Sequence, residues 1–429
     1  MLLSRITIEK LFGTFDYRIE LKPDGLTVLI GPNGYGKTTI LRMIDAFAEK
    51  RILFFVGLNF KRITFGFNDE RTIVIEKITD TKLRFIIDNE ERDIDAEPII
   101  ESVIDDSKLA VTIGIGPFDI GSQRAANIKD ILESIIPFKN TRYSIPNDVK
   151  DFFNFQFPDV YFIREQRLWR KIGNGNTSNG TNPSLGNPTY FIKPVYEENI
   201  EQYAKALKEI MGLVDSEYAE KTRELDSSYL RRFFESKDNI SEEEFRKRFE
   251  RIQKLQRSLN AYGLSVTQED PPSAFDPGNA KTLSVYLNDM EEKLNVFDEL
   301  LKALDLFTEI LNSRRFVNKR ICVSKEDGLK FVANDGTPLK LGDLSSGEQH
   351  EIAILFNMLF QAKPNTLVLI DEPEISLHIA WQKAFLSDLF RIIQLRKISV
   401  IVATHSPQII ADYWDNVVDL VHHGGTVDE

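Results

Sequence analysis

The stretch Leu26-Thr-Val-Leu-Ile-Gly-Pro-Asn-Gly-Tyr-Gly-Lys-Thr-Thr39 decides the fold. Its first five residues form an apolar run that is typical of a strand buried on both faces. Gly31–Thr38 matches the pattern Gly-x-x-x-x-Gly-Lys-[Ser/Thr] in full, and an apolar helical stripe begins directly after it. A strand, a glycine-rich turn and a helix in this order predict a phosphate-binding loop.

This loop is predicted to bind the phosphates of a nucleoside triphosphate together with Mg²⁺. Its glycines let backbone N–H groups close around phosphate oxygens, and the helix N-terminus adds a favourable dipole. Lys37 is expected to reach the β- and γ-phosphates, and the Thr38 hydroxyl is expected to bind the metal. The predicted nucleotide-binding residues of the loop are Gly31, Pro32, Asn33, Gly34, Tyr35, Gly36, Lys37, Thr38 and Thr39.

A second apolar strand, Leu367-Val-Leu-Ile-Asp-Glu372, ends in two carboxylates. We expect Asp371 to hold Mg²⁺ through its water shell and Glu372 to act as the general base that polarises the attacking water. A strand that ends in a solvated acidic turn is the alternative interpretation. The phosphate-binding loop in the same chain favours the catalytic one.

Two further segments flank this strand in the sequence. Asp343–Gln349 by itself predicts only a loop and a helix N-cap, but it precedes a predicted helix at 352–360 and the carboxylate strand. His405 follows another apolar strand, Ile398–Ala403. Ligands bind at the carboxyl ends of parallel strands, so we expect His405 to lie in the site.

Composition excludes several classes of protein. The chain has 429 residues and a formal net charge of −12. Such an acidic protein does not coat nucleic acid non-specifically, although a local basic groove could still bind it. Cys322 is the only cysteine, so an intramolecular disulfide and a cysteine metal cage are excluded. No apolar run is long enough to span a bilayer, and we expect a cytoplasmic protein without membrane contact.

The sequence predicts three segments: 1–195 and 316–429 as the two halves of an α/β ATPase domain, and 196–315 as a helical insertion between them. Residues 172–188 form a polar linker or surface loop. In the insertion, Ser241 and Glu244 have the spacing of a capping box. Two coiled-coil-like apolar stripes follow, one at Phe245, Phe249, Ile252, Leu255, Leu259 and Tyr262, the other at Met290, Leu294, Phe297, Leu301 and Leu304.

In this order, the motifs resemble those of the ABC-class ATPases of the structural-maintenance, RecF and overcoming-lysogenization-defect group. The resemblance implies an ABC-type P-loop NTPase head: an N-lobe with a mixed β-sheet, a parallel core sheet and a coiled-coil-like insertion, with ATP and Mg²⁺ as cofactors. Gln166 resembles the Q-loop glutamine that senses Mg²⁺ and the attacking water, His405 the switch histidine, and Glu374–His378 the D-loop. The segment that resembles the signature motif contains Ser345, Ser346, Gly347 and Glu348.

In this group the signature motif contacts the γ-phosphate bound to a second protomer. The resemblance therefore implies a head-to-tail homodimer, or a higher oligomer, with ATP sandwiched at each interface. Two positions depart from the family pattern. Ile379 stands where proline often follows Leu-His, which affects only the expected loop geometry, and Tyr35 occupies a tolerant position in the loop.

Three interpretations of the ATPase remain. The opening Leu11–Tyr17, the segment Phe162–Arg167 and the ending Thr404–Ile410 resemble the ATPase subunits of Septu anti-phage systems, which work with a separate HNH nuclease. Only residues 406–429 follow His405, so we expect no nuclease in cis. A stand-alone DNA-repair or chromosome-maintenance ATPase is the alternative, with basic clusters at 164–171 and 246–254 as potential DNA contacts. A transporter ATPase is disfavoured by the helical insertion.

Overall fold

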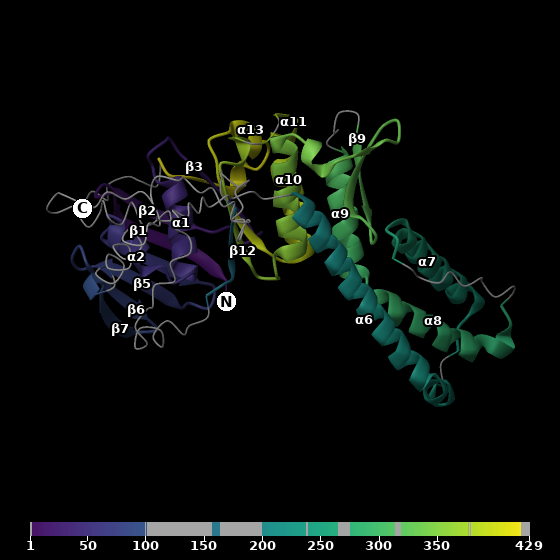
Figure 1. Cartoon of the computed structure of the whole chain (residues 1–429). Helices are drawn as coiled ribbons and strands as arrows, with labels where there is room; N and C mark the ends of the chain where they lie inside the picture. Colours follow the sequence, from purple (N-terminus) through teal and green to yellow (C-terminus); the bar gives the residue numbers. More distant parts are fainter. Residues whose placement is uncertain are drawn as a thin grey trace, which may run out of the picture. The chain divides into compact units, whose positions relative to one another are not determined.

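The computed structural model describes residues 2–98, 100, 157–163, 200–236, 239–264, 275–313, 319–375, 377 and 379–421. The chain divides into two compact units. The first consists of Met1–Glu198 and Ala362–Glu429, and the second of Asn199–Gln361. Figure 1 labels many of the elements of both units.

A five-stranded sheet forms the centre of the first unit, with strand order β14-β3-β13-β12-β8 and parallel pairing throughout. Its inner strands are almost entirely buried, as expected for apolar runs in a parallel sheet. The register places Asp371 opposite Ala403 and Ala403 opposite Leu29, so three strands end side by side. The strands are β3 (Leu26–Ile30), β8 (Val160–Ile163), β12 (Leu367–Asp371), β13 (Ser399–Ala403) and β14 (Val417–Asp419).

An antiparallel sheet of order β2-β1-β4-β5-β6-β7 makes up the rest of the described strands of this unit. Strand alternation in β4 and β6 buries every second side chain against a shared core. The strands are β1 (Leu3–Leu11), β2 (Phe15–Glu20), β4 (Arg62–Phe67), β5 (Thr72–Lys77), β6 (Lys82–Ile87) and β7 (Glu90–Asp95).

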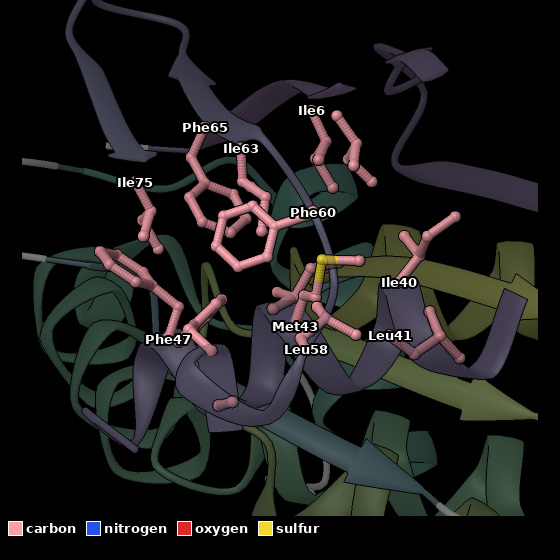
Figure 2. Packing of buried hydrophobic residues seen from close by; sticks show 14 of the residues in the cluster. Ile6, Ile40, Leu41, Met43, Phe47, Leu58, Phe60, Ile63, Phe65 and Ile75 are labelled. Atoms are coloured by element: carbon pink, nitrogen blue, oxygen red, sulfur yellow. The ribbon is translucent and has the colours of Figure 1, made fainter. Parts of the chain in front are cut away.

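Helix α1 (Lys37–Ala48) joins the phosphate-binding loop to this core. Figure 2 shows Ile40, Met43 and Phe47 of α1 among side chains of the antiparallel sheet. The Phe47 and Phe65 rings stack with centroids 4.9 Å apart, and both side chains are buried. Because α1 is held by this packing, its N-terminus and the loop before it have a fixed position. The other helices in the described part of this unit are α2 (Ile52–Gly57), α11 (Ile379–Gln382), α12 (Phe385–Arg396) and α13 (Pro407–Ile410).

The described part of the second unit begins with four helices. Ser241 caps α7 by accepting from the Glu244 N–H, as the sequence predicts. The second predicted stripe is buried but is divided between two helices, because the chain leaves the helical path at residues 296–297. Figure 1 shows α8 and α9 running in different directions. The helices are α6 (Ile200–Glu235), α7 (Glu242–Ala261), α8 (Ala280–Asn295) and α9 (Asp298–Ser313).

A three-stranded antiparallel sheet completes this unit, with β10 (Gly328–Ala333) between β9 (Lys319–Ser324) and β11 (Pro338–Leu339). Gly328 lies against the backbone of α6, where a Cβ would be 1.9 Å from the Ala204 carbonyl oxygen. Only glycine fits this approach. Helix α10 (Ser346–Phe356) follows and continues into a π-helical turn at Asn357–Gln361.

The predicted architecture is confirmed: an α/β chain with a parallel core sheet and a helical insertion. Helices α11 and α12 are separated by a break at 383–384. The boundary between the compact units falls at Ala362, so 316–361 belongs with the helices by its contacts. None of the helices in the described ranges is long and apolar enough to cross a membrane.

Candidate functional site

The phosphate-binding loop connects β3 to α1 and needs glycine at two left-handed positions. Gly34 has φ +87° and Gly36, the N-cap of α1, has φ +86°. A Cβ at Gly36 would also lie 2.9 Å from Leu11 Cδ2. The Tyr17 hydroxyl donates to the Tyr35 carbonyl oxygen at 2.8 Å, and burial raises the pKa of Tyr17 to about 12, so this donor keeps its proton.

Lys37 is buried at the start of α1, and its ammonium is held by acceptors from both ends of the chain. Nζ donates to the Gly31 carbonyl oxygen at 2.8 Å and to that of Pro32 at 3.4 Å. Nζ also lies 3.0 Å from His405 Nδ1. Burial lowers the pKa of Lys37, while the charges of Glu372 and Asp371 oppose this.

Thr38 and Asp371, which the sequence predicts as metal ligands, are in direct contact. The Thr38 hydroxyl donates to Asp371 Oδ1 at 2.9 Å, and the Asp371 side chain is buried at the end of β12. A hydroxyl and a carboxylate are oxygen ligands of the kind that Mg²⁺ prefers, so this pair fits the ion. The two residues lie 333 positions apart in the sequence.

Glu372 lies directly after β12 in a strained backbone conformation, with φ +47°. Its N–H donates to the Ala403 carbonyl oxygen at 2.9 Å, and its Oε1 lies 2.6 Å from His405 Nε2. The Lys37 ammonium has only donors, so Nδ1 of His405 accepts and Nε2 carries the hydrogen toward Glu372. The imidazole therefore links the P-loop lysine to the predicted general base.

These groups surround a cleft of about 520 Å³. Its walls carry hydroxyl, carboxylate and imidazole groups, which are the groups needed to bind a metal-bound phosphate and to activate a water molecule. All of the described lining residues come from the first unit. They are Asn33, Thr38, Glu372, Glu374, Ile375, His405 and Ser406.

The signature segment (Leu344–Glu348) lies in the second unit, at the N-terminus of α10. Ser345 is the N-cap and forms a reciprocal capping box with Glu348. Lys319 Nζ donates to Glu348 Oε2 at 2.9 Å. Burial raises the pKa of Glu348, but the hydrogen bonds from Lys319 and Ser345 prevail and hold it below its usual value.

Some predicted site residues are not placed. Gln166 lies outside the described residues, as do Ser376 and His378 of the predicted D-loop. The roles assigned to the signature segment stay predictions. Conversely, the structure brings Thr404, Ser406 and Gln382 to the site, where the sequence analysis gave them no role. Adjacency to His405 is the only sequence signal for the first two.

The pKa of Glu372 predicts a pH-dependent stability. Burial, and then the charge of Glu374, raise this pKa from 4.5 to about 7. As the pH rises, the Glu372 carboxyl therefore loses its proton at a lower pH in the unfolded chain than in the folded one. The contribution of Glu372 to the free energy of unfolding is fully present below pH 4.5 and is lost as the pH rises through about 7.

Without nucleotide and metal, Glu372→Gln should raise the melting temperature at pH 8 by about 2–4 °C and change it little at pH 4.5. Scanning calorimetry in EDTA checks this, with Glu20→Gln, a surface carboxylate paired with Arg18, as the control. Equal shifts at both pH values would contradict the assigned environment of Glu372.

The chain has matches among solved structures and among family models. No curated protein matches the chain. Among solved structures, an Smc head domain with an extended coiled coil bound to the C-terminal domain of ScpA, from Pyrococcus furiosus, is 15% identical. That match covers 97% of this chain and 93% of the other, with a TM-score of 0.36. An SmcHead bound to the C-winged helix domain of ScpA is 13% identical over 98% of this chain and 94% of the other, also with a TM-score of 0.36.

The family model described as "AAA ATPase domain" matches residues 1–410, nearly the whole chain and every described residue that lines the cleft. The chain belongs to this AAA ATPase domain family and is an ATPase.

Proposed function

We propose that the chain hydrolyses ATP with Mg²⁺ in a composite site, in which the cleft of one copy is completed by the signature segment of a second copy. The observation that carries this is the composition of the cleft, whose described lining comes from the first unit alone. The signature segment is a helix N-terminus in the second unit, with Ser345 and Ser346 exposed. Backbone N–H groups at such a terminus suit a phosphate.

We assign one task to each of five side chains in or next to the cleft. Lys37 and the N-terminus of α1 bind the phosphates, and Thr38 and Asp371 hold Mg²⁺, which neutralises phosphate charge when bound. Glu372 orients and polarises the attacking water. His405, bonded to both Lys37 and Glu372, connects phosphate binding to the base.

The ATPase cycle is proposed to serve as the sensor of a bacterial anti-phage complex with a separate HNH nuclease. This proposal is supported by the resemblance of three segments to the Septu ATPase subunits: Leu11–Tyr17, Phe162–Arg167 and Thr404–Ile410. ATP would close two copies and hydrolysis would reopen them. The helices of the second unit would carry this motion to the nuclease.

A stand-alone DNA-maintenance ATPase is the second candidate, favoured by one observation. Lys247, Arg251 and Lys254 are exposed on α7 at spacings of four and three, so they share one helix face. The two other basic residues of the cluster point to a structural role, because Arg246 pairs with Glu242 and Arg248 pairs with Glu291.

Purification of the tagged chain from its native host under mild conditions, with mass spectrometry of what accompanies it, separates the two candidates. The expected result is a stoichiometric small nuclease, with DNA cleavage by the complex that depends on ATP. A homo-oligomer without a partner that binds DNA through α7 would contradict the two-component proposal and favour the second candidate.

A further inference from the structure

Glu374 lines the cleft and lies two residues after Glu372, the predicted general base. Its carboxylate accepts a hydrogen bond from the backbone of His405, the predicted switch histidine. Oε1 accepts a hydrogen bond from the His405 N–H at 2.7 Å and another from the Thr404 hydroxyl at 2.7 Å. Thr404 is fully buried at the end of β13. One oxygen therefore accepts from both the hydroxyl and the N–H, which fixes the backbone at 404–405 relative to Glu374.

A second anchor comes from α11. The Gln382 side chain donates to the carbonyl oxygens of Glu374 and Leu377, at 3.2 and 3.1 Å. Its Oε1 accepts from the Ser406 hydroxyl at 3.2 Å. The residues on both sides of His405 are therefore tied to the segment that carries Glu374.

The His405 ring itself has weaker support from packing, since 35% of its side chain is exposed. Nδ1 of the ring lies 3.0 Å from Lys37 Nζ, and Nε2 lies 2.6 Å from Glu372 Oε1. Both distances depend on the position of the backbone at 404–405. A catalytic group displaced by about 1 Å can lose 10²-fold in rate.

We propose that Glu374 is a positioning residue, which holds the His405 imidazole in line with Lys37 and Glu372 and thereby sets the rate of ATP hydrolysis without binding ATP itself. The proposal rests on the roles of His405 and Glu372 in the proposed function. It deepens that function by adding a residue that acts through His405.

What this role needs from Glu374 is an acceptor. Oε2 is buried and makes neither of the two bonds to the segment, both of which go to Oε1. The two bonds to Oε1 need only an acceptor, which a glutamine amide oxygen also supplies.

The test is a double-mutant cycle on Mg-ATP turnover in the full chain. Glu374→Ala should lower kcat about 10–100-fold and leave the affinity for ATP within about threefold. At a pH well above 7, where Glu372 is ionised in both chains, Glu374→Gln should stay within about threefold of the wild type, because it keeps the acceptor. In the His405→Ala background, whose residual rate is followed with radiolabelled ATP, Glu374→Ala should cost less than about threefold more.

Equal losses from Glu374→Ala in both backgrounds, or a Glu374→Gln variant as slow as Glu374→Ala, would overturn the proposal. If Glu374→Ala does not fold, Thr404→Val replaces it in the cycle, since it removes one of the two bonds to Oε1. Affinity for ADP–vanadate gives a second measure, expected to weaken in step with kcat. A wild-type chain that does not hydrolyse ATP would instead defeat the proposed function, so the two failures are distinguishable.

Discussion

Glu372→Gln is expected to lower the kcat for Mg-ATP hydrolysis by about 10²–10³-fold while ATP remains bound. An amide keeps the size of the side chain and can still accept the hydrogen bond from His405 Nε2. It has no negative charge with which to polarise water, however. The loss therefore belongs to the chemical step, and a phosphate-release assay beside a binding titration separates the two.

The matched control for this variant is Glu20→Gln, which makes the same chemical change at an exposed carboxylate outside the cleft. It should turn over ATP at the wild-type rate. Unchanged turnover in Glu372→Gln would remove Glu372 as the base and leave the strained turn after β12 without a catalytic explanation.

Lys37→Ala is expected to weaken ATP binding by at least about 100-fold, which corresponds to about 2.7 kcal/mol. The ammonium is already oriented at the N-terminus of α1, so phosphate can replace its contacts with His405 and the loop carbonyls. Isothermal titration with a slowly hydrolysed ATP analogue measures the change.

Lys61→Ala is the control for this second variant, because Lys61 pairs with Glu9 and its side chain is 71% exposed. Circular dichroism and melting curves show whether Lys37→Ala stays folded. A folded variant that binds the analogue with wild-type affinity would contradict the assignment of the loop.

The parts of the site that could be predicted from sequence are those encoded locally. Gly34 and Gly36 are needed by the loop's own backbone, and an apolar run followed by Asp371 marks a strand that ends at a site. The order of the strands in the sheet is set by tertiary packing. The register of β3, β12 and β13 then brings the phosphate-binding loop and Asp371 together.

The individual hydrogen bonds between distant segments could not be predicted. Lys37 and His405 are 368 residues apart, and no periodicity relates the Glu374 carboxylate to the Thr404 hydroxyl. Helix breaks were also missed, since the apolar stripe from Met290 to Leu304 keeps its spacing through residues 296–297, where the chain turns. Spacing alone does not report a change of direction that tertiary packing imposes.

A cross-link between two copies of the chain tests directly whether they build the ATP site together. Cys322 is the only native cysteine, so Cys322→Ser gives a cysteine-free chain. One tagged chain then carries Asn33→Cys at the cleft, and a second chain of different size carries Ser346→Cys at the signature segment, both with Glu372→Gln. Asn33 and Ser346 are both exposed in the single chain.

With Mg-ATP and a short bismaleimide, the account predicts a cross-link between the two differently sized chains. The cross-link should be lost without ATP and in the Lys37→Ala variant. If the two chains bind ATP, and no cross-linked species forms between the cleft of one copy and the signature segment of the other, the claim that two copies build the site is contradicted.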